Sequence, residues 1–257
     1  MRRVYLLLPV FLFALVSHSC KQTTTRNRID ENHFPRVILW AWERPEDLEF
    51  LDPQRFGVAF LAQTLTLKDG EVVYSPRHQP LKLHPGAKLI AVTRIESQKI
   101  TREHVDLTDD LRKQLVEHIR KTLQLNNVSA VQVDFDAATS ERTFYRQLLQ
   151  DLRRELPDNV ALSMTALASF CVGDRWLKDL PVDEAVPMVF RMGIDSDRIR
   201  NLLTGGDFSE ALCRRSYGVA LDEPVRTSFD KQRRVYVFNA RSWTPADISL
   251  LEERFGH

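Results

Sequence analysis

A short segment near the middle of the chain carries two aspartates at alternating positions. In residues 131–136 (VQVDFD), apolar side chains alternate with Gln132, Asp134 and Asp136. A period of two is that of a β-strand, so the three polar side chains share one face. Two carboxyl groups in different surroundings can act as general acid and general base, because burial raises a carboxyl pKa. Asp134 and Asp136 are therefore catalytic candidates; the alternative is that Asp136 caps the strand end by accepting backbone N–H bonds.

Polar residues also end most of the other apolar runs of the chain. In a parallel barrel the C-terminal strand ends share one rim, which is where barrel enzymes hold their catalytic residues. The further catalytic candidates at these ends are Glu43, Glu96 and Glu223. The candidates for substrate binding are Trp40, Trp42, Arg94, Thr165, Arg191, Asp222, Asn239 and Trp243. The alternative is an ion-pair network in which Arg94 and Arg191 neutralise the two central aspartates without doing chemistry.

Tryptophans near carboxylates suit a carbohydrate ligand, because the apolar face of a sugar ring can stack on an indole ring. Trp40 and Trp42 lie in the first apolar run and Trp243 follows the last. These two runs are neighbours in a closed barrel. The alternative for each tryptophan is ordinary packing in the core.

The sequence lacks the motifs of several other classes of site. It has no HExxH or HxxEH histidine pair, no quartet of Cys and His ligands, no GxSxG turn, no Walker loop and no GxGxxG. We therefore expect neither a metal nor a cofactor. A divalent cation at the aspartate pair, as in a metal-dependent phosphodiesterase, is a weaker alternative. Lys and Arg total 36 against 35 for Asp and Glu, which argues against nucleic acid as a partner.

Eight short apolar runs rich in strand-forming residues follow one another along the chain. They are Val37–Trp42, Gly57–Ala62, Lys88–Ile95, Ala130–Asp136, Ala161–Leu167, Ala185–Met192, Tyr217–Asp222 and Arg234–Asn239. Helical patterns separate several of them, and strands that alternate with helices pair in parallel through right-handed crossovers. Eight such strands predict an α/β fold, a compact and irregular (β/α)8 barrel of the TIM type.

Capping residues mark the expected helix starts. Thr108 and Ser140 each precede an apolar pattern of helical period, and Thr244-Pro245 begins the last helix, while Asp195–Leu203 is a shorter candidate. Two connections depart from the barrel pattern. Thr64–Leu83 predicts a β-hairpin around Asp69-Gly70 between the second and third strands. Pro45–Leu51 predicts a short helical segment between the first and second.

Residues 1–20 have the pattern of an export signal. Two arginines precede the apolar stretch Val4–Val16, which is shorter than the roughly 20 residues of a membrane span. Ser19 stands immediately before Cys20, as in a bacterial lipobox, although Ser17 occupies the place where Leu is usual. We expect lipidation of Cys20 and anchoring to a membrane facing the periplasm. Ordinary signal cleavage is the alternative.

The rest of the chain is expected to form a tether and one domain. Residues 21–33 are polar and lack periodicity, which predicts a flexible tether, and residues 34–257 are expected to form a single barrel domain. Cys171 and Cys213 are the two cysteines of that domain. In an exported chain they predict a disulfide, with two buried thiols as the alternative.

Four segments resemble a family of exported bacterial proteins described as a domain of unknown function, the DUF3142 type. They are residues 38–45 (ILWAWERP), 133–136 (VDFD), 185–193 (AVPMVFRMG) and 222–224 (DEP). The resemblance runs from about Phe34 to Trp243 and implies no established activity. More distantly, residues 134–136 are similar to the DxxDxDxE signature of chitinase-type glycoside hydrolases, in which the last Glu is the proton donor. Here Val131 replaces the first Asp and Ala138 replaces that Glu.

These patterns together predict an exported glycoside-hydrolase-like barrel that hydrolyses an envelope or extracellular glycan. Asp136 is the expected first carboxylate, and Glu223, Glu96 or Glu43 the second. The alternative is a non-catalytic protein that binds glycan, or scaffolds an envelope complex, through a degenerate active site. Ala138 favours that alternative. The sequence predicts no particular oligomeric state.

Overall fold

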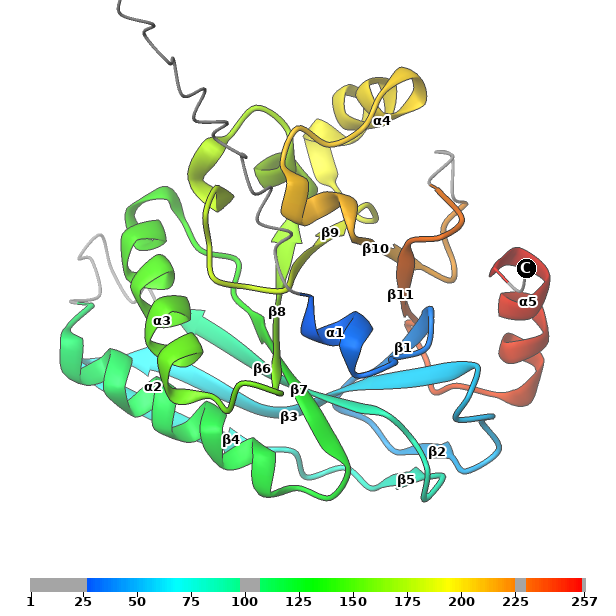
Figure 1. Cartoon of the computed structure of the whole chain (residues 1–257), viewed down its shortest axis with the longest axis horizontal. Helices are drawn as coiled ribbons and strands as arrows, with labels where there is room; N and C mark the ends of the chain where they lie inside the picture. Colours follow the sequence, from blue (N-terminus) through cyan, green and yellow to red (C-terminus); the bar gives the residue numbers. More distant parts are fainter. Residues whose placement is uncertain (1–26, 98–106, 225–229, 256–257) are drawn as a thin grey trace, which may run out of the picture.

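Eight parallel strands form a closed barrel (Figure 1) in the computed structural model, which describes residues 27–97, 107–224 and 230–255. The strands are β1 (Val37–Ala41), β3 (Phe56–Lys68), β6 (Leu89–Ser97), β7 (Val128–Asp134), β8 (Ala161–Leu167), β9 (Glu184–Met188), β10 (Ser216–Ala220) and β11 (Arg234–Phe238). They lie side by side in the order β1-β11-β10-β9-β8-β7-β6-β3, and the pairing of β1 with β3 closes the ring. Each strand overlaps one predicted run, so the predicted barrel is confirmed.

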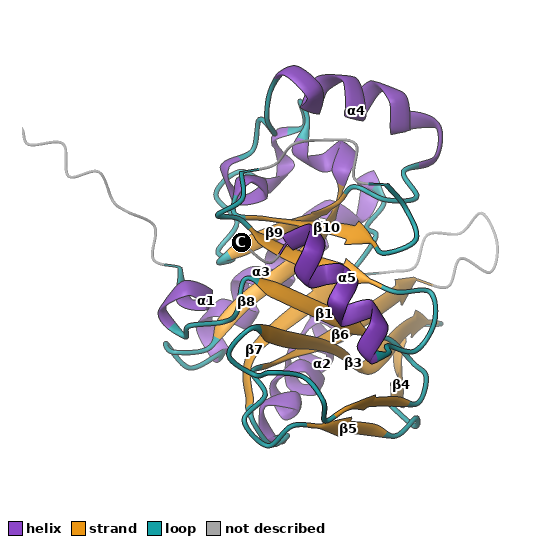
Figure 2. Ribbon diagram, turned by 90° about the vertical axis from the view of Figure 1, so that its right-hand side faces the viewer, coloured by secondary structure: helices purple, strands orange, loops and turns teal. Residues whose placement is uncertain are grey.

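Helices cover the outside of the barrel where the sequence has apolar residues at helical spacing. They are α2 (Asp109–Lys121), α3 (Arg142–Glu155), α4 (Ser196–Gly205) and α5 (Pro245–Phe255). Leu115 of α2 and Leu148 of α3 are fully buried in the layer between helices and strands. Thr108 caps α2 as predicted, because its Oγ1 accepts a hydrogen bond from the Leu111 N–H at 3.2 Å. In Figures 1 and 2 α4 lies at the top of the molecule, beyond the end of β9.

The prediction that Ser140 caps the next helix is wrong. A single 3₁₀ turn, Thr139–Glu141, follows β7, and α3 begins after it at Arg142. The carboxylate of Glu141 reaches back and accepts a hydrogen bond from the Ala138 N–H at 2.6 Å. Glu141 therefore satisfies a backbone donor at this helix start. The remaining 3₁₀ turns are Thr122–Gln124, Ala168–Cys171, Arg175–Leu177, Gly193–Asp195 and Ala211–Arg214.

The two irregular connections lie between β1 and β6. The predicted hairpin is present: β3 pairs antiparallel with β4 (Glu71–Pro76), and Asp69 and Gly70 both have positive φ in the turn between them. The predicted helical segment over Pro45–Leu51 is wrong. That segment contains the strand β2 (Glu46–Leu48), which pairs with β5 (Leu81–Leu83). The hairpin brings β5 beside residues 46–48, and this long-range pairing outweighs the local helical preference.

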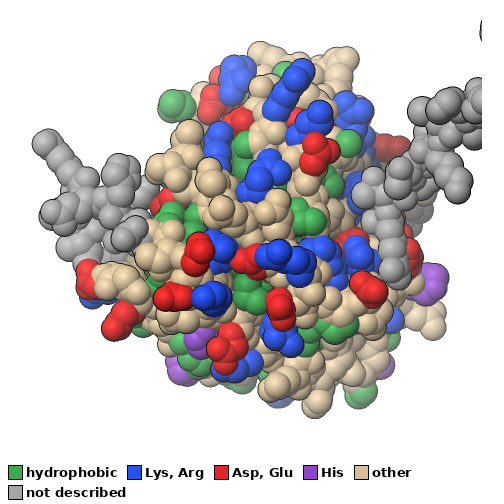
Figure 3. All heavy atoms as spheres, turned by 60° about the vertical axis from the view of Figure 1, so that its left-hand side comes forward, with side chains coloured by type: hydrophobic (Ala, Val, Ile, Leu, Met, Phe, Trp, Pro, Cys, Tyr) green, Lys and Arg blue, Asp and Glu red, His purple; other side chains and the backbone are tan. Residues whose placement is uncertain are grey.

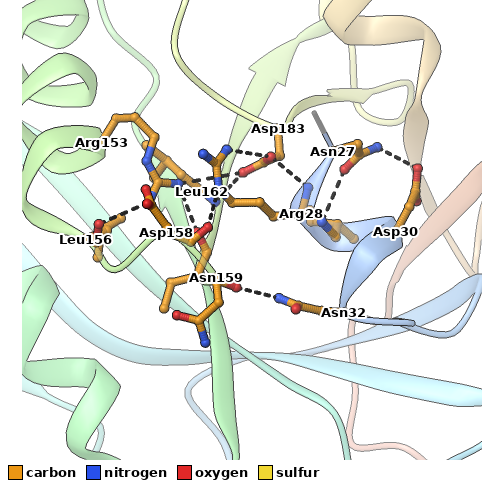
Figure 4. Close-up of polar contacts among 12 residues, drawn as sticks. Asn27, Arg28, Asp30, Asn32, Arg153, Leu156, Asp158, Asn159, Leu162 and Asp183 are labelled. Carbon is orange, nitrogen blue, oxygen red and sulfur yellow. Dashed lines mark hydrogen bonds and ion pairs between the residues drawn. The ribbon is translucent and has the colours of Figure 1, made fainter. Parts of the chain in front are cut away.

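A short helix, α1 (Arg28–Glu31), closes the N-terminal end of the barrel (Figure 1). Its Ile29 is fully buried among interior residues, although the sequence predicted a flexible tether through residue 33. Asp183, which precedes β9, accepts hydrogen bonds from the Arg28 N–H at 2.9 Å and from the Leu162 N–H at 2.8 Å (Figure 4). The part of the predicted tether from residue 28 onward is therefore folded. Folding buries the Ile29 side chain and gives the Asp183 carboxylate a hydrogen-bond donor from α1.

Polar side chains cross the interior of the barrel in hydrogen-bonded pairs. The Trp40 indole N–H donates to Gln132 Oε1 at 3.1 Å, and Gln132 Nε2 donates to Ser163 Oγ at 3.0 Å. Nearer the N-terminal end, buried Glu184 accepts from the Tyr236 hydroxyl and pairs with Arg234 at 3.1 Å. These contacts give Gln132, Ser163 and Glu184 the hydrogen-bond partners that buried polar side chains need.

Cys171 and Cys213 are joined in a disulfide with a Cα–Cα distance of 6.0 Å. It links the turn after β8 to the turn before β10. Within the described ranges no helix is both long enough and apolar enough to cross a membrane.

Candidate active site

A cavity of about 810 Å³ opens at the C-terminal ends of β3, β6 and β7. Charged side chains line much of it. The lining residues are Thr66, Lys68, Val73, Arg94, Ile95, Glu96, Ser97, Asp134, Phe135, Asp136 and Glu141. The rim position is the one expected for the chemistry of a barrel enzyme.

Asp134 is the last residue of β7 and lies at the floor of the cavity. Its Oδ1 accepts a hydrogen bond from the Thr165 hydroxyl at 2.7 Å, and its Oδ2 lies 3.7 Å from the Arg94 guanidinium. Burial is the main reason that the pKa of Asp134 is raised, and the neighbouring Asp136 raises it further. Thr165 is thus placed to hold Asp134, and it is itself buried away from solvent.

Asp136 lies two residues beyond the strand, on the same face, and opens to the cavity. Partial desolvation raises its pKa, and the charge of Arg94 opposes that rise. Within the described ranges its carboxylate has no hydrogen bond and no ion pair within 4 Å. Asp136 therefore combines the two properties of a general acid, a raised pKa and a carboxyl group free to meet a substrate.

Arg94 connects the carboxylates of the cavity to an aromatic ring. Its Nε donates to Glu96 at 2.7 Å, and its guanidinium lies over the Trp42 ring at 5.4 Å from the centroid. Trp42 is half-buried and also packs edge-on against Phe238. Arg94 thus lies between the carboxylates of the cavity and the Trp42 ring, which is not itself a lining residue.

Replacing Asp134 by Asn is expected to stabilise the protein at neutral pH. A carboxyl whose folded pKa is raised above its usual 3.8 binds more protons in the folded state, so stability falls as pH rises through that window. Asn cannot ionise, and its carbonyl oxygen can still accept the Thr165 hydroxyl. We expect a Tm higher by about 2–4 °C at pH 7, the change that about 1 kcal/mol produces at this size. The gain should vanish near pH 4, and a Tm gain that persists there would contradict the burial argument.

Arg191 forms a separate cluster on the β9–β10 side of the rim. Its guanidinium pairs with Asp222 at 3.0 Å, and its backbone N–H donates to Glu223 at 3.2 Å. Arg200 of α4 also lies 3.8 Å from Glu223. The predicted network in which both arginines neutralise the central aspartates is therefore wrong: Arg94 reaches Asp134, whereas Arg191 is committed to its own acids.

Two predicted substrate-binding tryptophans lie in the core instead. Trp40 points into the barrel and is 5% exposed, because its indole N–H finds Gln132 there. Trp243 is 4% exposed, and its indole N–H donates to the Trp40 carbonyl at 2.9 Å. Trp42 follows the last residue of β1, is half-buried, and lies beside the Arg94 guanidinium.

Glu43 and Asn239 have structural partners and do not line the cavity. Glu43 accepts hydrogen bonds from the backbone N–H groups of His78 and Gln79, at 3.0 and 3.1 Å, and so holds the connection after β4. Asn239 is buried, and its side chain lies 3.5 Å from Asp247 at the start of α5. Of the three further carboxylates that the sequence predicted, Glu96 alone lines the cavity.

Glu141 is the cavity carboxylate that the sequence reasoning missed. It follows a strand end by a 3₁₀ turn, and patterns of strand period do not reach that far. The local signal was incomplete, because a capping box has Ser or Thr three residues before the acid, whereas this chain has Ala138 there.

A second hollow, of about 740 Å³, lies between α2 and α3. Its charges are paired: Arg112 with Asp151 at 2.5 Å, and Arg120 with Glu155 at 3.2 Å. The face in Figure 3 likewise shows basic and acidic side chains interspersed. Because its charges are paired, this hollow has no surplus of one sign that would indicate a charged ligand.

The eight parallel strands and their covering helices define the protein as a (β/α)8 barrel of the TIM type with an acid-lined cavity at its rim. Residues 85–190 match the family model described as a domain of unknown function, DUF3142. This range contains Arg94, Glu96, Asp134, Asp136 and Glu141, so the expected resemblance is confirmed over residues 85–190, which include these cavity residues. No curated protein matches the chain.

Two solved structures with similarity to the chain are barrels from spore-forming bacteria. The Bacillus cereus spore cortex-lytic enzyme SleL has 15% sequence identity and a TM-score of 0.46, over 73% of this chain and 52% of that one. The chitinase domain of the spore coat protein CotE from Clostridium difficile has 11% identity and a TM-score of 0.43, over 79% and 64%. The chain therefore spans between half and two thirds of the length of these structures.

Proposed function

We propose that this protein hydrolyses a glycan of the cell envelope or the extracellular space. The observation that carries the proposal is Asp136, which is exposed to the rim cavity and has no ion-pair partner in the described ranges, while partial desolvation raises its pKa. Asp136 would protonate the leaving glycosidic oxygen. Hydrolysis needs a second carboxylate to activate or replace the attacking water.

Several neighbours support a sugar as the ligand. Asp134 is fixed beneath Asp136 by Thr165, and Arg94 lies between the carboxylates and the Trp42 ring. Carboxyl groups beside an aromatic face are what a sugar ring with many hydroxyl groups requires.

The test is release of new reducing ends from peptidoglycan, chito-oligosaccharides, β-glucan and xylan by the purified protein. Turnover of one glycan, with products identified by mass spectrometry, is the expected result. The alternative function is non-catalytic glycan binding, which Ala138 favours because that position lacks a carboxyl group. Saturable binding of a glycan with no new reducing ends would overturn hydrolysis and support that alternative.

We also propose that the protein is exported and anchored through a lipid on Cys20. The disulfide between Cys171 and Cys213 supports export, because such bonds persist outside the reducing cytoplasm. Replacing Cys20 by Ser is expected to move the protein from the membrane fraction to the soluble fraction of the producing bacterium. Cys171→Ser, which removes a cysteine without touching the anchor, is the control. A Cys20→Ser protein that stays with the membrane would contradict the lipid anchor.

A further inference from the structure

We propose that Glu141 is the second catalytic carboxylate of the rim cavity, the group that takes the proton of the attacking water. This inference rests on the hydrolytic function proposed above, and it names a residue that no strand pattern indicated. The argument comes from a comparison of the carboxylates that could act with Asp136.

The three carboxylates predicted as partners of Asp136 each have another commitment. Glu43 and Glu223 hold backbone N–H groups outside the cavity. Glu96 lines the cavity, but its carboxylate is held by the Arg94 Nε at 2.7 Å, and its side chain is 48% exposed. A carboxylate bound to a guanidinium at the surface is a weak base and a poorly fixed one.

Glu141 has the opposite properties. It is 6% exposed, lines the same cavity as Asp134 and Asp136, and comes from the turn that directly follows β7. One carboxylate oxygen, Oε2, is fixed by the Ala138 N–H at 2.6 Å. The other, Oε1, has no hydrogen-bond partner in the part of the chain that the structure describes. A backbone donor therefore fixes the carboxylate and leaves one oxygen available to the cavity.

The same contact gives the cavity a carboxylate beside Ala138, where the chitinase-type signature has a Glu; in the step proposed here Asp136 is the proton donor and Glu141 the base. The Glu141 carboxylate lies at the Ala138 backbone, so a carboxyl group reaches this place from the start of α3 instead of from residue 138 itself. The sequence motif is thus interrupted, while the cavity keeps a carboxylate there.

The proposed step balances as an ordinary hydrolysis. Water oxygen bonds to the anomeric carbon while Glu141 Oε1 takes a proton from that water. The bond from the anomeric carbon to the leaving oxygen breaks as Asp136 gives that oxygen its proton. Exchange with solvent then returns both carboxyl groups to their starting states.

Glu141→Gln tests this role, because the Gln amide oxygen can still accept the Ala138 N–H. We expect the full-length variant to keep its Tm and to lose at least about 100-fold in kcat on the glycan that the wild type hydrolyses. Glu96→Gln is the matched control, the same change in the same cavity, and should lose less than about tenfold. Azide should restore turnover of Glu141→Gln and yield a glycosyl azide, because azide attacks without losing a proton.

Three outcomes overturn the inference. Glu141→Gln could retain wild-type kcat within about threefold, or Glu96→Gln could lose more than Glu141→Gln. Azide could also fail to restore turnover at a temperature where the variant is folded, which would mark the loss as structural. A wild-type protein that hydrolyses none of the glycans overturns the proposed function itself, and is thereby distinguished from a failure of Glu141 alone.

Discussion

Asp136→Asn is expected to lower kcat/KM by about 100- to 10,000-fold on the glycan that the wild-type protein hydrolyses. Asn has the same shape but carries no acidic proton, so the leaving oxygen would depart as an unprotonated alkoxide. The fold should be unaffected, because Asp136 has no hydrogen bond or ion pair to lose within the described ranges. The measurement is kcat/KM from reducing-end release, with Tm measured on the same samples.

The pH profile separates this role from a loss of binding. Because partial desolvation raises the pKa of Asp136, wild-type activity should fall as pH rises through that raised value, and the variant should lose this limb. Asp110→Asn on α2 is the control: it is the same substitution at an exposed carboxylate that pairs with Lys113 and does not line the cavity. Wild-type activity in Asp136→Asn, or an unchanged alkaline limb, would exclude Asp136 as the acid.

Asp183→Ala is expected to lower the free energy of unfolding by about 3–5 kcal/mol, the usual cost of breaking a buried ion pair. The Asp183 carboxylate is fully buried and accepts from the Arg28 guanidinium at 3.2 Å as well as from two backbone N–H groups. Alanine would leave these donors unsatisfied and would release α1 from the N-terminal end of the barrel (Figure 4). Urea denaturation measures the change.

Asp158→Ala is the matched control at the same end of the barrel. Asp158 is exposed, and Arg28 contacts its backbone carbonyl at 2.7 Å, which alanine retains. We expect a change of less than about 0.5 kcal/mol. Equal losses in both variants would show that the Asp183 carboxylate does not hold α1 in place.

The order of apolar runs and helical patterns along the chain was enough to predict the barrel. Residues 131–136 alternate because a barrel strand has an inner and an outer face, and the period of two carries directly into β7 and its rim carboxylates. The hairpin turn at Asp69-Gly70 was equally local, since positive φ at both residues is a property of the turn itself. Residues 46–48 were mispredicted because their strand exists through β5, which lies more than thirty residues away.

The sequence alone thus determined the strands, the rim and the two aspartates, because each follows from the order of neighbouring residues. Tertiary structure decided which side chains meet. It placed Trp40 in the interior beside Gln132, and it committed Arg191 to Asp222 and left Asp136 unpaired within the described ranges. It also turned Glu141 back to the Ala138 N–H. These contacts join different strands or depend on how a turn folds, and no periodic pattern in one segment specifies its partner in another.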